Sequence, residues 1–246
     1  MSLMGRLLWV TRPIEQSTGL IQRLVKEAAC PLSCPLFVIR PDPLALTRLK
    51  LQAHHADWLI FVSPSAIDIA WPILATYPPK GRLATVGLSS AQRLSERAGR
   101  SVLAPREGSG SEALLAESEL KKVVGQRLLV VRGHNGRSLL PDVLAQRGAQ
   151  VECADIYYRM DLQPDWQRFD MRIPDAIILT SSDMVERLFR SAGPTRSTAL
   201  QYIPYCVPHP RIAEHLMARG VEHIVTTQAD DESLVAGLKK WFYHRP

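Results

Sequence analysis

The sequence lacks the residue patterns that mark metal-binding, redox-active and membrane-spanning proteins. Its four cysteines are Cys30, Cys34, Cys153 and Cys206. They form no C-x-x-C pair and their spacing fits no zinc site, so we expect reduced thiols and a cytoplasmic location. The longest apolar runs, such as residues 58–62, are far shorter than a membrane-spanning helix requires. Residues 1–8 contain no long apolar stretch, and we therefore expect no signal peptide.

The common catalytic and cofactor-binding motifs are also missing. The chain has no H-E-x-x-H, no G-x-S-x-G and no Walker A pattern. His209 and His215 are too far apart to share a helix face as metal ligands. Residues 108–113 match G-x-G-x-x-A, but residues 105–107 separate them from the preceding strand, and the next strand ends in Arg132 instead of an acidic residue. We therefore expect no metal and no cofactor.

Basic residues outnumber acidic ones, yet they are not clustered. The formal net charge is +6 and the isoelectric point is about 9.3, which favours an anionic partner. No run of five or more Lys and Arg residues occurs, which argues against a disordered arm that binds nucleic acid. The two candidate anionic partners are nucleic acid and a small polyacid. Because the only support for nucleic acid is the isoelectric point and no binding motif is recognisable, we expect a small polyacid, and neither nucleic acid nor a membrane.

Short apolar runs alternate with helix-period segments along nearly the whole chain. Apolar residues make up 46% of the 246 residues and charged residues 22%, as in ordinary folded proteins. Strands are expected at 7–10, 58–62, 83–86, 101–103, 127–131, 176–179, 203–207 and 223–225. Helices are expected at 15–26, 65–74, 90–97, 112–119, 138–147, 184–189, 212–219 and 232–242. Because the strands are continuously apolar, helices should cover both faces of the sheets, which indicates α/β architecture with parallel sheets.

Two stretches interrupt this alternation and predict the domain boundaries. Residues 35–43 contain three prolines, and residues 151–174 combine an extended run with a polar segment that has few helix signals. If the two stretches lie side by side, residues 41–155 form an inserted α/β domain. Residues 1–37 and 162–246 then form a discontinuous α/β domain, with linkers near 35–43 and 151–164. The sequence equally permits two consecutive domains.

Hydroxyl-bearing and small residues gather directly after the expected strands. In open parallel sheets, ligands bind outside the carboxyl ends of the strands, so these turns are the candidate site. The candidate substrate-binding residues are Thr11, Arg12, Ser63, Ser65, Ala66, Gly87, Ser89, Ser109, Gly110, Ser111, Arg132, Gly133, Thr180, Ser181, Ser182, His209 and Arg211. Each turn alone is explained by helix capping. Together, helix N-termini from two facing domains would form a cleft for a ligand that carries many carboxylates.

Three further side chains each admit two interpretations. Arg12 and Arg132 close two strands, where they would give charge-assisted bonds to carboxylates or be ordinary solvated residues. Tyr157 lies in the second predicted linker, where its phenol would face the cleft or pack as a structural aromatic.

An ordered set of short motifs resembles the uroporphyrinogen-III synthases. The motifs lie at residues 11–13 (TRP), 61–66 (FVSPSA), 86–87 (VG), 110–115 (GSEALL), 132–133 (RG), 136–144, 148–149, 156–159 (IYYR), 179–182 (LTSS) and 211–220. Each motif is loose by itself, but the set spans nearly the whole chain in order. At His209-Pro210-Arg211 the chain departs from the Gly-, Ser- or Thr-rich turn that many relatives have, which leaves open what this turn contacts.

The resemblance implies two flavodoxin-like or Rossmann-like α/β domains joined by a two-stranded linker. It implies the substrate hydroxymethylbilane, a linear tetrapyrrole with acetate and propionate arms, and the product uroporphyrinogen III, an intermediate of haem and sirohaem biosynthesis. No cofactor or metal is implied. We expect a monomer that receives its substrate from hydroxymethylbilane synthase. Tyr157 matches the family's tyrosine and would donate a proton to the leaving hydroxyl. The alternative is a non-catalytic two-lobed α/β protein that binds a small polyanion in the cleft between its domains.

Overall fold

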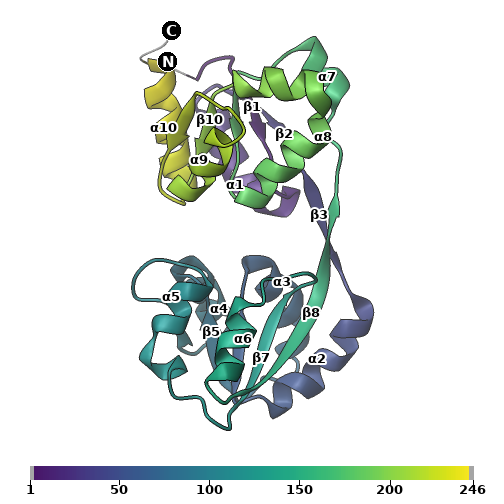
Figure 1. The fold of residues 1–246 in the computed structure, drawn as a ribbon, viewed down its shortest axis with the longest axis vertical. Helices are drawn as coiled ribbons and strands as arrows, with labels where there is room; N and C mark the ends of the chain where they lie inside the picture. Colours follow the sequence, from purple (N-terminus) through teal and green to yellow (C-terminus); the bar gives the residue numbers. More distant parts are fainter. Residues whose placement is uncertain (1–2, 244–246) are drawn as a thin grey trace. The chain divides into compact units, whose positions relative to one another are not determined.

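The chain is divided into two units in the computed structural model, which describes residues 3–243. Unit 1 contains residues 3–38 and 160–243, and unit 2 contains residues 39–159. The chain therefore leaves unit 1 once and returns to it once (Figure 1). The outermost residues of the expected discontinuous domain, 1–2 and 244–246, lie outside the described residues.

Unit 1 is built on a parallel sheet of five short strands. The strands are β1 (Leu7–Val10), β2 (Cys30–Ser33), β9 (Ala176–Ile178), β10 (Tyr205–Val207) and β11 (Ile224–Thr226). They pair in the order β11-β10-β9-β1-β2, and every pairing is parallel. All carboxyl ends of these strands therefore lie along the same edge of the sheet.

Helices cover both faces of this sheet. They are α1 (Ile14–Lys26), α7 (Trp166–Met171), α8 (Ser182–Gln201), α9 (Pro210–Met217) and α10 (Asp231–Tyr243). Successive side chains of a strand point to opposite faces. Leu8 and Val10 accordingly pack in one core with α1 and α10. Trp9 packs on the other face against Phe169 of α7, with 5.3 Å between the ring centroids.

Unit 2 is built on a sheet of six strands. They are β3 (Phe37–Pro41), β4 (Trp58–Phe61), β5 (Arg82–Thr85), β6 (Val102–Leu103), β7 (Arg127–Gly133) and β8 (Gln150–Asp161). Their order is β3-β8-β7-β4-β5-β6, and the pairings from β8 to β6 are parallel. The chain passes between the units within β3 and within β8, which are neighbours in this order.

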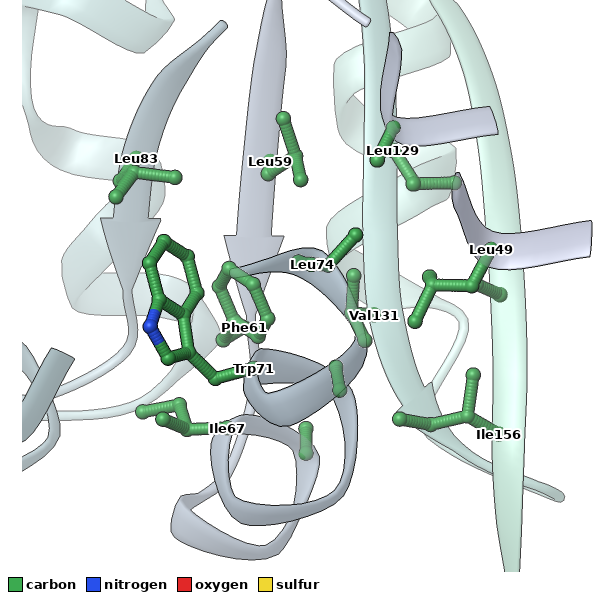
Figure 2. Packing of buried hydrophobic residues seen from close by; sticks show 14 of the residues in the cluster. Leu49, Leu59, Phe61, Ile67, Trp71, Leu74, Leu83, Leu129, Val131 and Ile156 are labelled. Carbon is green, nitrogen blue, oxygen red and sulfur yellow. The ribbon is translucent and has the colours of Figure 1, made fainter. Parts of the chain in front are cut away.

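Both faces of the second sheet are also covered. The helices are α2 (Pro43–His55), α3 (Pro64–Leu74), α4 (Leu88–Ala98), α5 (Ser111–Ala116), the 3-10 helix η1 (Ser118–Leu120) and α6 (Leu139–Gln146). Leu59 and Phe61 of β4 lie in one core with Trp71 of α3, as Figure 2 shows. Trp58 and Ile60 point the other way, into a core formed with α5 and α6. Burying each such side chain contributes roughly 1.5–3 kcal/mol, so the continuous apolar strands are held from both sides.

The predicted α/β class with parallel sheets is confirmed, but several stretches were missed or assigned wrongly. No strand was predicted at residues 30–33, where β2 lies. The prediction of few helices in residues 162–174 is wrong, because α7 lies there. Residues 44–55 have no predicted element, yet they form most of α2. Asp42 is the N-cap of α2, and its carboxylate accepts hydrogen bonds from the N–H groups of Leu44 and Ala45. Asp followed by Pro43 at the first helical position is a recognised start signal, so α2 was predictable.

Helix α8 extends well beyond the predicted residues 184–189. It contains 20 residues and bends at Gly193, whose φ of 70° lies in the left-handed region that glycine tolerates. Pro194 follows directly, where its fixed φ suits the first turn of the second segment. None of the described helices, α8 included, is long and apolar enough to cross a membrane.

Candidate functional site

The predicted substrate-binding residues lie at the carboxyl ends of strands, each set within its own unit. Those of unit 1 follow β1, β9 and β10 and are Thr11, Arg12, Thr180, Ser181, Ser182, His209 and Arg211. Those of unit 2 follow β4, β5 and β6 or end β7, and are Ser63, Ser65, Ala66, Gly87, Ser89, Ser109, Gly110, Ser111, Arg132 and Gly133. Because the strands in each set are parallel and adjacent, each set lies along one edge of its sheet.

Three of these side chains cap the helix that follows them. Ser63 and Ser181 each accept a hydrogen bond from the backbone N–H three residues on, at 3.0 and 3.3 Å. His209 accepts from the N–H of Arg211 at 3.1 Å through Nδ1, so this nitrogen carries no proton while the bond exists. Capping therefore explains these three turns, and the His209 side chain takes the role that a Ser or Thr would have.

The hydroxyls of unit 1 are largely committed to the protein itself. Thr11 is fully buried, and its hydroxyl donates to the carbonyl of Ile178 at 2.8 Å. The Thr180 hydroxyl lies 3.6 Å from the sulfur of Met184. The Ser182 hydroxyl oxygen is buried and has no hydrogen-bond partner among the described residues. A ligand at this edge would therefore meet backbone N–H groups more readily than hydroxyls.

The two arginines that close strands are already paired with carboxylates. Arg12 Nη1 lies 2.7 Å from Asp231 Oδ1, and the Arg12 side chain is 14% exposed. Arg132 Nε lies 2.7 Å from Asp155 Oδ1, and the Arg132 side chain is 16% exposed. Their charges are therefore compensated within each unit, and a substrate carboxylate would have to compete with Asp231 or Asp155.

Three of the described helices begin after a residue whose side chain has no acceptor atom for capping. Helices α1, α4 and α5 start after Pro13, Gly87 and Gly110, and none of these residues offers an acceptor atom in its side chain. The first N–H groups of a helix have no partner inside the helix, and the helix dipole makes this end positive. These three ends are therefore suited to an anion.

The start of α4 and the glycine-rich turn before α5 lie next to each other in unit 2. The Gly110 N–H donates to the carbonyl of Val86 at 2.7 Å. A Cβ atom on Gly87 would lie 3.7 Å from Cβ of Ser109. Ser89 and Ser109 are both exposed. Uncapped N–H groups and two exposed hydroxyls thus meet in one small area, where a carboxylate can accept several hydrogen bonds.

A buried carboxylate holds the chain that leads into this turn. Glu117 is 8% exposed and accepts from the backbone N–H of Arg106 at 2.8 Å. The Arg106 guanidinium Nε lies 3.5 Å from the same carboxylate. Nothing in the sequence marked Glu117, because a single Glu inside a helical segment has no distinguishing pattern.

A β-bulge in β8 sets the position of Tyr157. Arg132 pairs with Asp155, whereas the next residue, Gly133, pairs with Tyr157, so Ile156 is an extra residue on β8. Ile156 and Tyr157 consequently both face the core of unit 2, and Tyr157 is only 1% exposed. A Cβ atom on Gly133 would lie 2.4 Å from the Tyr157 ring, so this contact requires glycine. Bulges near functional sites often redirect a side chain in this way.

The Tyr157 hydroxyl contacts another predicted site residue. It lies 3.0 Å from Ser63 Oγ, and Arg159 Nη2 donates to it at 3.5 Å. Because Ser63 Oγ already accepts the N–H of Ala66, the Ser63 hydroxyl can donate its own proton to the Tyr157 oxygen. In that arrangement the Tyr157 proton is available to a further acceptor.

Three residues beside the bulge form a cluster that no sequence motif marks. Tyr158 donates to Asp42 Oδ2 at 3.1 Å, and His134 Nε2 lies 2.9 Å from the same oxygen. The His134 and Tyr158 rings are stacked, with 3.8 Å between centroids and 6° between planes. We call Asp42, His134 and Tyr158 the Asp42 clasp.

Hydrogen bonding shifts the pKa values of Asp42 and Tyr158 within the Asp42 clasp. The N–H of Ala45, followed by His134, Tyr158 and the N–H of Leu44, holds the pKa of Asp42 below its usual value of 3.8. The hydrogen bond to Asp42 raises the pKa of Tyr158 above 10.0. Asp42 is therefore an anion and Tyr158 a proton donor at neutral pH. Among the described residues, no group of three His, Cys, Asp or Glu side chains could hold a metal ion.

Comparison with known proteins identifies a single family. The family model described as "Uroporphyrinogen-III synthase HemD" matches residues 19–236. Uroporphyrinogen-III synthase of Salmonella typhimurium (strain LT2) is 30% identical over 244 residues, covering 94% of this chain and 98% of that protein. The Escherichia coli (strain K12) protein of the same name is 28% identical over 250 residues, with the same coverage.

Solved structures agree with this family in fold. A mutant uroporphyrinogen III synthase from the extremely thermophilic bacterium Thermus thermophilus superimposes with a TM-score of 0.69 at 18% identity, covering 98% of this chain and 100% of that one. The uroporphyrinogen-III synthetase of Helicobacter pylori 26695 gives a TM-score of 0.59 at 14% identity, covering 95% of this chain and 97% of that one.

Proposed function

The chain belongs to the uroporphyrinogen-III synthase family of lyases, and we propose that it converts hydroxymethylbilane into uroporphyrinogen III. The reaction removes water, closes the linear tetrapyrrole into a ring and inverts ring D. The family match over residues 19–236 carries the proposal, because it covers both units and not a single motif. The same match favours this enzyme over a non-catalytic protein that binds a polyanion.

We propose that backbone N–H groups hold the carboxylates of the substrate. The uncapped starts of α1, α4 and α5 support this proposal, because each offers N–H donors at the positive end of a helix dipole. In unit 2, Ser89 and Ser109 add exposed hydroxyls beside Gly87 and Gly110. In unit 1, the turn after β1 would contribute through its backbone, because the Thr11 hydroxyl is bonded to Ile178.

The remaining candidate residues have supporting or competing roles in this proposal. Arg12 and Arg132 would reach a carboxylate only by giving up Asp231 or Asp155. The turns and helix starts at the carboxyl edge of each sheet contain the other candidates, each proposed as a contact within its own unit: Ser65, Ala66, Ser111 and Gly133 in unit 2, and Thr180, Ser181, Ser182, His209 and Arg211 in unit 1.

The chemistry requires a proton at the start and releases one at the end. Protonation of the terminal hydroxyl lets it leave as water, and an electrophilic azafulvene remains. The substituted carbon of ring D attacks it to give a spiro intermediate. The bond that originally joined that carbon to the rest of the chain then breaks, which leaves a new azafulvene at the other end of the broken bond. The free carbon of ring D attacks this azafulvene, loses a proton and so closes the ring. The pyrroles supply the electrons, so the enzyme mainly holds the reacting carbons together.

We propose Tyr157 as the proton donor to the leaving hydroxyl. Its phenol lies 3.0 Å from Ser63 Oγ at the carboxyl edge of β4, and Ser63 can stabilise the phenolate by donating to it. The proton lost from ring D at the end of the reaction restores the phenol. Tyr157→Phe should lower kcat without unfolding the protein, and an unchanged kcat would remove Tyr157 from the mechanism.

The isomer of the product tests the proposed function. Purified protein, without added metal or nucleotide, should convert hydroxymethylbilane mainly into the type III isomer. Spontaneous closure gives the symmetric type I isomer, so a product that is only type I would refute the proposal. Action as a monomer, a cytoplasmic location and transfer of the substrate from hydroxymethylbilane synthase are further proposals that rest on the family resemblance.

A further inference from the structure

The bulge in β8 decides to which face of the sheet Tyr157 points. Side chains alternate along a strand, so a register without the extra residue Ile156 would reverse the faces of the residues that follow it. Tyr157 would then leave the core and Tyr158 would enter it. The observed register is the one with the bulge, because Tyr157 is 1% exposed and Tyr158 is 45% exposed.

Two residues of the Asp42 clasp hold the bulge through their backbones. The N–H of Asp42 donates to the carbonyl of Ile156 at 2.8 Å, and the N–H of His134 donates to the carbonyl of Tyr157 at 2.8 Å. These two carbonyls belong to the extra residue and to the tyrosine itself. The bulge is therefore bonded on one side to the start of α2 and on the other to the turn after β7.

The side chains of the same residues connect the start of α2 to the turn after β7. His134 and Tyr158 both bond to Asp42 Oδ2, while Asp42 Oδ1 accepts the first N–H groups of α2. The stacked rings keep Tyr158 over His134, on the face opposite to Tyr157. As long as Tyr158 is held there, its neighbour Tyr157 must face the core and Ser63.

We propose that the Asp42 clasp is a positioning device that keeps the Tyr157 hydroxyl beside Ser63 for proton transfer. This inference rests on the proposed role of Tyr157. The clasp residues act through the bulge, so they are positioning residues, and their loss should lower kcat more than it changes KM. A displacement of about 1 Å at a reacting group can cost on the order of a hundredfold in rate, so a partial loosening should cost less.

Tyr158→Phe is the mildest test, because it removes one hydroxyl and keeps the stacked ring. Its kcat for formation of the type III isomer should fall about threefold, as for one lost hydrogen bond. His134→Ala removes both the stacking and the second bond to Asp42, and its kcat should fall about thirtyfold. Tyr202→Phe is the matched control, because Tyr202 is 65% exposed at the end of α8, and it should keep kcat within about twofold.

A double-mutant cycle distinguishes loss of the Tyr157 position from a general loss of protein stability. In the Tyr157→Phe background, Tyr158→Phe and His134→Ala should lower kcat less than about twofold, because the group they position is gone. Equal losses in both backgrounds, or no loss of kcat in the presence of Tyr157, would overturn the inference. Type I product from the unaltered chain would overturn the proposed function as well, whereas type III product with additive losses would overturn the clasp alone.

Discussion

One added carbon at Gly133 should test the placement of Tyr157 directly. In Gly133→Ala the new Cβ would lie 2.4 Å from Cε2 and 2.6 Å from Cζ of the Tyr157 ring. Gly133 does not have a positive φ, so alanine fits the backbone and only the ring is in conflict. The substitution is therefore a steric change aimed at one side chain.

The expected magnitude follows from that overlap. Carbon atoms in contact prefer a separation of about 3.5–4.0 Å, so the ring must move by about 1 Å. Tyr157 is buried in the core of unit 2, and overpacking of this kind costs about 1–3 kcal/mol of unfolding free energy. A shift of about 1 Å in a proton donor should lower kcat on the order of a hundredfold. KM should change little, because alanine keeps the backbone N–H of residue 133 and the proposed carboxylate contacts at Ser89 and Ser109 are not altered.

The assay should measure initial rates of type III formation together with urea unfolding. Gly237→Ala is a matched control, because its Cβ would lie 2.5 Å from Cγ2 of Thr227, a similar overlap in unit 1. We expect a comparable loss of stability from the control, with kcat within about twofold of the unaltered chain.

Two results would refute this reasoning in different ways. If Gly133→Ala loses stability but keeps its turnover, the position of Tyr157 does not matter and its role as proton donor is lost. If neither stability nor turnover changes, the close contact between Gly133 and Tyr157 is not present in solution.

Three further predictions concern charge, pH and the Thr11 hydroxyl. Asp231→Asn should release Arg12, and if Arg12 binds a substrate carboxylate then KM should fall about two- to fivefold; an unchanged KM would remove Arg12 from the site. Burial raises the pKa of Cys34 and of Cys206 from 9.0 to about 12, so the unfolded chain loses these protons first and the free energy of unfolding falls as pH rises from 9 toward 12. Each thiol contributes at most about 1.4 kcal/mol to this decrease per pH unit. In urea unfolding, a variant with both Cys34→Ala and Cys206→Ala should lose most of the decrease in unfolding free energy between pH 9 and 10. A decrease equal to that of the unaltered chain would contradict the prediction. Thr11→Val should cost about 1 kcal/mol in urea unfolding and leave KM within about twofold, whereas a tenfold higher KM would show that the hydroxyl binds substrate.

Part of the candidate site could be predicted from the sequence because strand ends are recognisable locally. The run 7–10 is a strand with the predicted bounds, so Thr11 and Arg12 were correctly placed at its carboxyl end. Ser63 and Gly87 also follow predicted strands, although β4 ends at Phe61 and not at residue 62, and β5 ends at Thr85 and not at residue 86. What each side chain does there was not predictable, because its partner is distant in the chain. Arg12 pairs with Asp231, and Ser63 contacts Tyr157 across 94 positions of sequence.

The contacts of the Asp42 clasp were likewise not predictable from local sequence. Asp42 before Pro43 is a local signal for the start of α2, and it identifies Asp42 as a cap. Its second carboxylate oxygen, however, binds His134 and Tyr158, which are 92 and 116 positions away. No local pattern predicts such contacts, because they depend on how the strands pair.

The sequence by itself determined the α/β class, most strands and helices, the position of the candidate turns after the strands, and the family. These features follow from short-range periodicity and from helix-start residues, which act within a few positions of each other. Only the tertiary structure decided that Ile156 is an extra residue in β8 and that Tyr157 therefore packs on Gly133 beside Ser63. The reason is physical: a bulge is a property of two paired strands, and the register of β8 on β7 is fixed by contacts that neither strand contains alone.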